Sequence, residues 1–227
     1  MQMKFCEWEP IYESIISDMG YSRSEDESAV RVLKAVTVNS DLIDDDEASS
    51  FFDRTVTVVG NSPALLDDLE SFPPEGPVIA SGSSVYRLSS AGVKPDVVVT
   101  DLDGEIESQI KASDDGALTF IHAHGDNVDL IREYAWRFKG PIILTTQSVP
   151  ENTVSNYGGF TDGDRAVCIA RYFGAQHILM LGFDYGNPMP KEGSDLSVKL
   201  RKLKWAENII GMVAEGCLKY PSTHQVH

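Results

Sequence analysis

Six short runs of apolar and β-branched residues between positions 55 and 182 most restrict the fold of this chain. They are TVTVVG, PVIAS, DVVVT, LTFIHA, PIILTT and HILMLG, and amphipathic segments or loops connect most of them. Strands that are apolar on both faces are typical of a parallel sheet covered by helices. The sequence therefore predicts a Rossmann-like α/β fold, with a mostly parallel sheet of about six strands flanked by helices.

The segments on either side of these runs are predicted to be helical. Two short apolar stripes at helical spacing occur before residue 50, namely Trp8, Ile11, Ile15 and Ile16, then Ala29, Val32, Leu33 and Val36. A longer stripe predicts one helix from Ser194 to Cys217. The acidic run at 44–47 is expected to be a solvated helix end or loop. We therefore expect a helical N-terminal segment over residues 1–50 and an α/β domain over 51–227 that ends in the long helix.

The charge balance argues against two classes of partner. Acidic residues outnumber basic residues 35 to 19, which gives a formal net charge of −16. Such a surface repels nucleic-acid backbones and anionic lipids, so we expect neither nucleic acid nor a membrane as a partner. The segment MQMKFCEWEP lacks the basic and apolar regions of a signal peptide, and the three cysteines form no CxxC pair. We therefore expect a cytoplasmic protein with reduced thiols.

Small and polar residues follow every predicted strand. In chain order they are GNSP at 60–63, SGSS at 81–84, DLDG at 101–104, HAHGDN at 122–127, TTQ at 145–147 and GFDYG at 182–186. The carboxyl ends of parallel strands meet at one edge of the sheet, and ligands bind beyond that edge in open α/β sheets. We therefore predict a functional cleft there.

Two aspartates at the end of the third run predict a metal site. Asp101 and Asp103 are two positions apart, so their side chains point to the same side if the strand continues. Asp126, at the end of the next strand, could add a third carboxylate. Hard oxygen ligands suit Mg²⁺, which usually carries a phosphate substrate. Alternatively, Asp101 caps the following helix and Asp103 lies in its first turn.

The pair His122 and His124 resembles the start of an HxHxDH zinc site. Asn127 stands where that motif has its last histidine, and His177, His224 and His227 are the remaining histidines of the chain. A dinuclear zinc site therefore lacks ligands. We expect the two histidines to orient substrate or contact phosphate, or to have a purely structural role.

Several further residues are predicted to contact phosphate or substrate. Small residues before a helix expose backbone N–H groups that bind anions, and Asn61, Ser62, Ser81 and Gly82 stand at such positions. The sequence has neither GxxxxGK[ST] nor GxGxxG, and turn chemistry alone is the alternative reading. Lys199 and Lys202 lie one turn apart on the long helix, where they could neutralise phosphate or simply face solvent.

Taken together, the motifs resemble a known family. TDLDG after a buried strand looks like the GDLDS motif of thiamin pyrophosphokinases. The fuller set, VVGNSPALL, ASGSSVYRL, PDVVVTDLDG, HAHGDN, GGFTDGDRAV, LGFDYG and KLRKLKWAE, resembles the archaeal 6-hydroxymethyl-7,8-dihydropterin diphosphokinases of the MptE type. The resemblance runs from about Val56 to the C-terminal helix.

This resemblance implies transfer of diphosphate from ATP to a small pterin alcohol, with Mg²⁺, in archaeal folate-like or methanopterin synthesis. It implies that Asp101, Asp103 and Asp126 hold Mg²⁺ and that the phosphate-contacting residues named above face the nucleotide. Gly159, Thr161 and Asp162 would line the site. For the acceptor, Asp162 or Asp164 could accept from a pyrimidine N–H edge, and Phe160, Tyr157 or Phe183 could stack on its ring.

Other functions stay open at this point. Thiamin pyrophosphokinases carry a β-rich C-terminal domain, whereas the 45 residues after the last predicted strand (227 − 182) read as helix, which argues against thiamin. The GNSPALL loop also resembles the nucleotide-sugar loop of some bacterial sialyltransferases. A regulatory module that binds a nucleotide without turnover is the alternative outside enzymes. The terminal helices could pack on the sheet or on a second copy, so a homodimer is possible.

Overall fold

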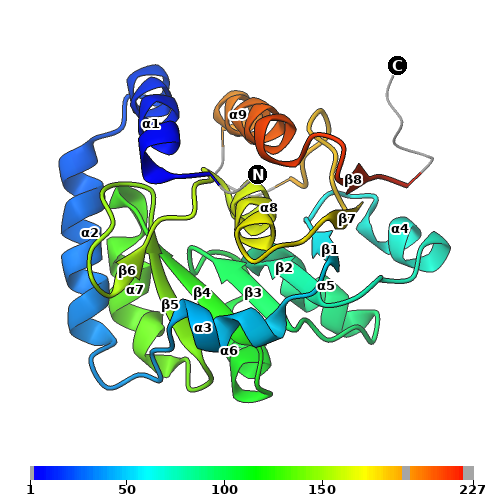
Figure 1. Cartoon of the computed structure of the whole chain (residues 1–227), viewed down its shortest axis with the longest axis horizontal. Helices are drawn as coiled ribbons and strands as arrows, with labels where there is room; N and C mark the ends of the chain where they lie inside the picture. Colours follow the sequence, from blue (N-terminus) through cyan, green and yellow to red (C-terminus); the bar gives the residue numbers. More distant parts are fainter. Residues whose placement is uncertain (1–2, 191–194, 222–227) are drawn as a thin grey trace.

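The structure, a computed structural model, describes residues 3–190 and 195–221. Within these ranges eight strands form one sheet in the order β6-β5-β4-β3-β2-β1-β7-β8, and every neighbouring pair is parallel (Figure 1). The strands are β1 (Thr55–Val59), β2 (Val78–Ser81), β3 (Val97–Thr100), β4 (Leu118–Ala123), β5 (Ile142–Thr146), β6 (Val154–Ser155), β7 (His177–Leu181) and β8 (Leu218–Lys219). The predicted parallel α/β fold is thereby confirmed.

The six strands that the sequence predicts are buried along almost their whole length. Only the first residue of β1 and the first residue of β7 are not buried. The two further strands, β6 and β8, lie at the two edges of the sheet and contain two residues each. Such short strands leave no apolar run in the sequence, so the prediction of about six strands missed them.

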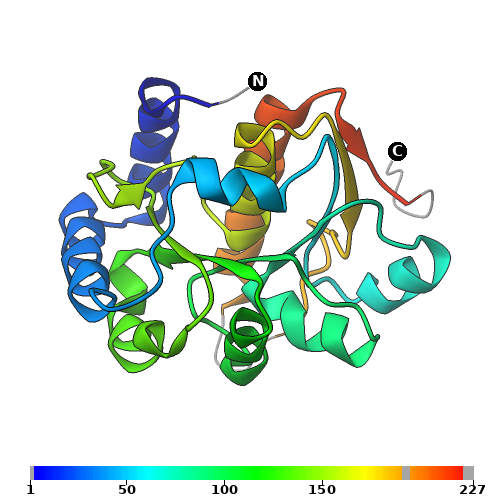
Figure 2. The same ribbon diagram turned by 60° about the horizontal axis from the view of Figure 1, so that its bottom comes forward.

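Helices cover both faces of the sheet (Figure 2). One face packs against α1, α3, α8 and α9, and the other face packs against α2 and α4 to α7. The helices are α1 (Phe5–Met19), α2 (Arg23–Val36), α3 (Asp45–Ala48), α4 (Leu65–Ser71), α5 (Val85–Ser90), α6 (Ile106–Asp114), α7 (Val128–Tyr134), α8 (Asp162–Tyr172) and α9 (Leu196–Ala214). Short 3₁₀ turns lie at η1 (Ser49–Phe51), η2 (Gly82–Ser84), η3 (Gly125–Asn127) and η4 (Ala135–Arg137).

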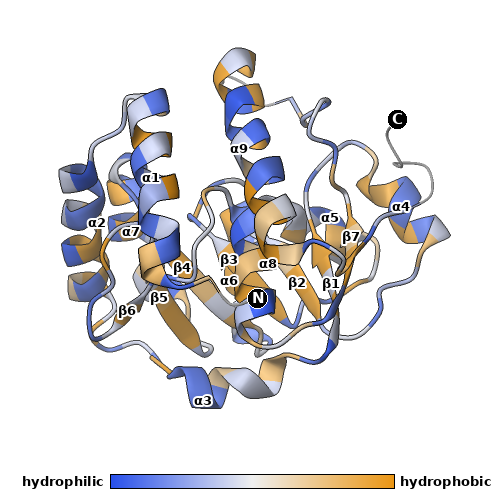
Figure 3. Cartoon of the chain, turned by 45° about the horizontal axis from the view of Figure 1, so that its top comes forward, coloured by the Kyte–Doolittle hydropathy of each residue, from blue (hydrophilic) through white to orange (hydrophobic). Residues whose placement is uncertain are grey.

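Successive side chains along a strand point to opposite faces of the sheet, so each long strand contributes residues to the hydrophobic cores on both faces. On β1, Val56 and Val58 belong to the core beneath α8, whereas Val59 belongs to the core on the opposite face. Figure 3 shows the strands as the most hydrophobic part of the chain, while α1 and α9 carry hydrophilic residues as well. The continuous apolar runs therefore reflect burial on two sides.

The N-terminal helices form as predicted and pack against the sheet. On α1, Trp8 is buried and its Nε1 donates a hydrogen bond of 2.8 Å to the carbonyl oxygen of Gln147, just after β5. On α2, Ala29 and Leu33 are buried in the same core as Leu144 of β5. The proposed domain division at residue 50 stays a prediction.

Two other helical predictions need adjustment. The long C-terminal helix runs from Leu196 to Ala214, so it ends three residues before the predicted Cys217, and the predicted start at Ser194 lies outside the described residues. The acidic run is only partly solvated, because Asp45 begins α3 and accepts hydrogen bonds of 2.5 and 2.6 Å from the hydroxyls of Tyr157 and Tyr172. Among the described helices, none combines the length and the apolar character that a bilayer crossing requires.

The packing of α2 predicts that the N-terminal segment unfolds together with the sheet. Leu33 is fully buried, so Leu33→Ala should lower the free energy of unfolding by about 2–5 kcal/mol. Leu66 on α4 is 43% exposed, and Leu66→Ala should change it by less than about 0.5 kcal/mol. Denaturant unfolding followed by circular dichroism measures both. A Leu33→Ala variant whose main transition keeps the wild-type midpoint would show that α2 is a separate unit.

Candidate active site

A cavity of about 650 Å³ lies beyond the carboxyl ends of the strands. Most of the predicted site residues line it, namely Asn61, Ser62, Ser81, Asp101, Asp103, His122, His124, Asp126, Phe160, Thr161, Asp162, Lys199 and Lys202. The predicted edge of the sheet therefore does bring these residues together. Two predicted residues, Gly82 and Gly159, are not among the described residues that line the cavity. A Cβ at Gly82 would lie 2.5 Å from Thr100 Oγ1, and a Cβ at Gly159 would lie 2.4 Å from the Cα of Arg165.

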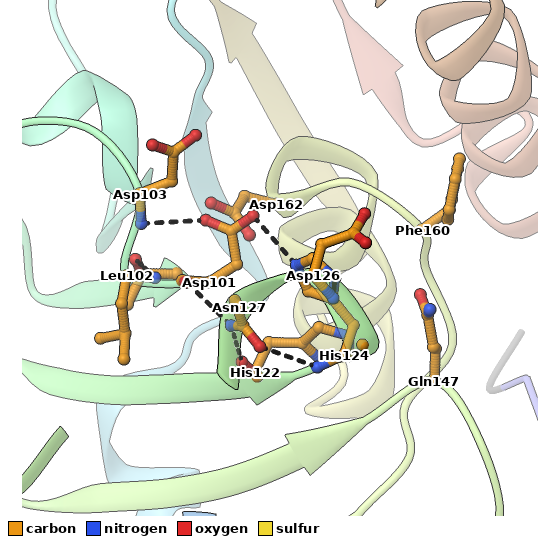
Figure 4. A network of polar contacts seen from close by, with 12 residues as sticks. Asp101, Leu102, Asp103, His122, His124, Asp126, Asn127, Gln147, Phe160 and Asp162 are labelled. Carbon is orange, nitrogen blue, oxygen red and sulfur yellow. Dashed lines mark hydrogen bonds and ion pairs between the residues drawn. The ribbon is translucent and has the colours of Figure 1, made fainter. Parts of the chain in front are cut away.

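The two aspartates after β3 lie on a turn. The strand ends at Thr100, and Leu102 has a φ of 68°, a left-handed conformation that is uncommon outside glycine. Thr100 Oγ1 accepts a hydrogen bond of 2.8 Å from the N–H of Leu102. Asp101 Oδ1 accepts one of 3.1 Å from the N–H of Asp103, which Figure 4 shows. The strand ends where the sequence places its end, so the condition under which both side chains would point to the same side, a strand that continues, is not met. The alternative that these aspartates cap the next helix is wrong, because Glu105 is the N-cap of α6.

Two buried amide side chains hold this turn. Gln109 accepts a hydrogen bond of 2.6 Å from the hydroxyl of Thr100 and donates one of 2.8 Å to the carbonyl oxygen of Asp103. Asn127 donates hydrogen bonds of 2.8 Å to the carbonyl oxygens of Asp101 and His122. The sequence indicated neither role, and it marked Asn127 only as the position of a missing zinc ligand.

His124 faces Asp101 across the cavity floor. Its Nε2 lies 3.5 Å from Asp101 Oδ2, and its Nδ1 accepts a hydrogen bond of 3.3 Å from the N–H of Asp126. Because Nδ1 accepts, the ring proton lies on Nε2, toward the carboxylate. Burial acts to raise the pKa of Asp101, but the hydrogen bonds from His124 and from the N–H of Asp103 outweigh it, so this pKa is lowered. Asp101 therefore stays ionised.

A third carboxylate, that of Asp162, lies beside Asp101 (Figure 4). Asp162 is the first residue of α8, and Thr161 is the N-cap of this helix. Burial raises the pKa of Asp162 well above its ordinary value, and the charges of Asp101 and Asp103 raise it further. The sequence predicted Asp162 as a lining residue but gave no sign of this pairing, because the two aspartates are far apart along the chain.

Arg165 on α8 is a buried cation that the sequence did not indicate. Its guanidinium contacts His122 Nε2 at 3.0 Å and Asp162 Oδ1 at 3.3 Å. A guanidinium only donates, so His122 accepts through Nε2 and its Nδ1 proton points to Thr145 Oγ1, 3.0 Å away. Burial lowers the pKa of His122 well below its ordinary value, and the charge of Arg165 adds to this effect. His122 is therefore a neutral ring with a fixed orientation.

The donor set bears on which metal this site could hold. Within the described residues, no three His, Cys, Asp or Glu side chains are close enough together to enclose an ion. A site for Mg²⁺ needs no such enclosure, because this ion is usually held by one or two carboxylates together with waters and substrate phosphates. The carboxylates of Asp101 and Asp103 fit that chemistry. Asp126 lines the same cavity from η3, and its place as a third ligand stays a prediction.

One end of the cavity lies where β1 and β7 are neighbours in the sheet. Chain order reverses here, since β2 to β6 lie on one side of β1 and β7 and β8 lie on the other, and such switch points bind ligands. Gly60 and Gly182 pack closely, and a Cβ at Gly60 would lie 2.7 Å from the carbonyl oxygen of Gly182. Ser62 is 4% exposed, and its buried Oγ has no hydrogen-bond partner among the described residues. Arg87 donates a hydrogen bond of 3.1 Å to Asn61.

Helix α9 brings the two predicted lysines to the cavity. Lys199 Nζ donates a hydrogen bond of 2.5 Å to the carbonyl oxygen of Met189. Lys202 Nζ lies 5.3 Å from the ring centroid of Tyr21 and 5.8 Å from that of Phe160. A cation over an aromatic face is attracted by the ring quadrupole. The two ammonium groups therefore lie against different parts of the cavity wall.

Comparisons with known proteins show the family of this chain. Residues 31–189 match the family model described as "6-hydroxymethylpterin diphosphokinase MptE-like". The 6-hydroxymethyl-7,8-dihydropterin pyrophosphokinase of Pyrococcus furiosus is 37% identical over 222 residues, which cover 92% of this chain and 93% of the relative. The protein of the same name from Methanothermobacter thermautotrophicus is 37% identical over 218 residues, which cover 89% of this chain and 92% of the relative.

A solved structure has a similar fold. The MAf glycosyltransferase from Magnetospirillum magneticum AMB-1 superposes with a TM-score of 0.55 and 14% identity over 92% of this chain. This chain spans 40% of the length of that glycosyltransferase, and at so low an identity the likeness shows the fold alone. The family model and the two relatives, in contrast, confirm the resemblance that the motifs indicated. The chain belongs to the MptE-like family of 6-hydroxymethylpterin diphosphokinases.

Proposed function

We propose that this protein transfers diphosphate from ATP to 6-hydroxymethyl-7,8-dihydropterin and releases AMP and the pterin diphosphate. The observation that carries the proposal is the pair of carboxylates, Asp101 and Asp103, on a fixed turn after β3, between the cavity residues that follow β1 and those that follow β5. Relatives at 37% identity bear the name of this activity. The geometry suits a reaction that joins two substrates, one bound on each side of the carboxylates.

ATP is proposed to bind at the switch-point end. Asn61, Ser62 and Ser81 line this end, and the Ser62 hydroxyl, which has no hydrogen-bond partner within the described residues, is proposed to bond to a phosphate oxygen. Lys199 and Lys202 are proposed to neutralise the transferred phosphates from α9. Phosphoryl-type transfers depend mainly on such positioning and charge neutralisation.

Mg²⁺ is proposed as the metal, held by Asp101 and Asp103 with Asp126 as a third carboxylate. When bound, it would neutralise phosphate charge and orient the phosphates. The protein's own groups prepare this position. His124 keeps Asp101 ionised, Arg165 offsets the charge of Asp162, and the amide groups of Gln109 and Asn127 fix the turn.

In the proposed reaction, the pterin hydroxyl oxygen bonds to the β-phosphorus of ATP, and the hydroxyl proton passes to water. The bond from that phosphorus to the oxygen bridging the α- and β-phosphates breaks, and AMP leaves. His122 is held neutral by its surroundings, so we assign it an orienting role. We propose that the enzyme is cytoplasmic and acts in archaeal folate-like or methanopterin synthesis. We also propose that it forms a homodimer.

AMP release tests the reaction directly. Purified protein is given ATP and Mg²⁺ with either 6-hydroxymethyl-7,8-dihydropterin or thiamin, and the nucleotides are separated by chromatography. We expect AMP with the pterin alone, loss of AMP formation when a chelator removes the metal, and recovery when Mg²⁺ is restored. AMP with thiamin would identify a different acceptor. If neither acceptor gives AMP, the proposal is wrong and the nucleotide-sugar and regulatory alternatives return.

Substitution of the two turn carboxylates tests their role. Asp101→Asn and Asp103→Asn keep the side-chain size and an acceptor oxygen but remove the charge, so each should lower kcat by at least about 100-fold. The control is Asp129→Asn on α7, where the side chain is 95% exposed and pairs with Arg132. It should keep wild-type kcat. Folded Asp101→Asn and Asp103→Asn variants with full turnover would rule out this assignment.

A further inference from the structure

The end of the cavity opposite the switch point is built by the N-terminal helices. Tyr21, in the α1–α2 connection, and Glu25 and Asp26, in the first turn of α2, line it together with Gln147 and Phe160. The rings of Tyr21 and Phe160 lie 6.3 Å apart and form an apolar wall. This end therefore combines aromatic surface with carboxylates, as a small polar heterocycle requires.

The buried carboxylate of Asp26 connects the segments that form this end of the cavity. It is 3% exposed, and its oxygens accept hydrogen bonds of 2.8 Å from the hydroxyl of Tyr12, from Gln147 Nε2 and from the N–H of Gly125. These bonds tie α1, α2, the end of β5 and η3 to one carboxylate. With three donors already bound, Asp26 is a positioning residue for the wall and does not itself read a ligand.

Two other carboxylates close to Phe160, those of Asp164 and Asp162, already have partners. Asp164 accepts hydrogen bonds of 2.6 and 2.7 Å from the backbone N–H groups of Phe160 and Thr161. Asp162 is paired with Arg165. Tyr157 is bonded to Asp45 and is absent from the described cavity lining. Asp164 and Tyr157, two of the side chains that the sequence offered for contact with the acceptor ring, are therefore already engaged elsewhere.

Glu25 differs from these carboxylates. It lines the cavity, and within the described part of the chain its carboxylate makes no hydrogen bond or ion pair. Its position is nevertheless constrained, because it packs against Gly125 so closely that a Cβ there would lie 2.8 Å from the Cβ of Glu25. A carboxylate with unused acceptor capacity therefore projects from a fixed helix turn.

We propose that Glu25 is the specificity-determining residue that accepts hydrogen bonds from the N–H groups of the acceptor's aminopyrimidinone edge. This inference rests on the proposed function and names the subsite of its acceptor. A pterin presents its 2-amino group and N3–H on one edge, and a carboxylate accepts both. A triphosphate would be repelled by the same carboxylate, which favours ATP at the other end of the cavity.

The placement also suits the reaction. A pterin carries its hydroxymethyl group at the end of the ring system opposite the aminopyrimidinone edge. Gly125 lies next to His124 along the chain, and His124 Nε2 lies 3.5 Å from Asp101. An acceptor bound against Glu25 therefore directs its hydroxymethyl group along η3 toward the turn carboxylates.

Glu25→Gln tests the assignment, because it keeps the side-chain size and removes the charge. We expect the dissociation constant of 6-hydroxymethyl-7,8-dihydropterin and its KM to rise by about ten- to one-hundred-fold, the usual effect of losing a charged hydrogen bond. The KM for ATP should stay unchanged. Equilibrium binding is followed by the quenching of protein fluorescence and needs no turnover. The matched control is Glu27→Gln on the same helix, because Glu27 is not in the cavity lining, and it should bind the pterin as the wild type does.

An analogue of the acceptor with hydrogen in place of the 2-amino group sharpens the test. The wild type should bind it about tenfold more weakly than the pterin, and Glu25→Gln should lose most of this preference, since the two changes remove the same interaction. Unchanged pterin binding by Glu25→Gln, or an increase only in the KM for ATP, would overturn the inference. Because binding is measured apart from AMP formation, a wild type that binds the pterin through Glu25 without turnover would contradict the proposed function alone.

Discussion

Repulsion among carboxylates is the constraint around which the site is organised. Asp101, Asp103 and Asp162 lie close enough for the first two to raise the pKa of the third. Two like charges at short range stay together only where neighbouring cations, hydrogen bonds or a bound cation offset them. Here His124 and Arg165 supply part of that compensation. The side-chain amides of Gln109 and Asn127 donate hydrogen bonds to the carbonyl oxygens of Asp103 and Asp101, and these bonds hold the turn in place.

The sequence predicted those features that depend on local pattern. Continuous apolar runs marked the six long strands, and the polar residues after them marked the edge where the cavity lies. It did not predict the left-handed conformation of Leu102, because a leucine between two aspartates carries no sequence signal for a positive φ. The sequence also contained no indication of contacts between residues that are far apart along the chain. Asp26 and Gln147 are 121 positions apart, so no spacing rule connects them.

Helices that precede and follow the six predicted strands also shape the site. Helix α9 follows the last long strand and brings Lys199 and Lys202 to the cavity, while α2 precedes the first strand and brings Glu25 and Asp26. The sheet itself supplies the floor and the carboxylates. The fold thus supplies a common scaffold, and the residues grafted on its edge and flanking helices determine what the site can bind.

The hydrogen bond from Trp8 to Gln147 spans 139 residues of chain. A ribosome releases the first helix long before β5 exists, so Trp8 and Tyr12 have no native partners on the sheet during most of synthesis. Long-range contacts of this kind form late, because the intervening loop must first be closed. The helix that is made first is thus among the last to reach its native contacts, and the acceptor end of the cavity is finished only when it does.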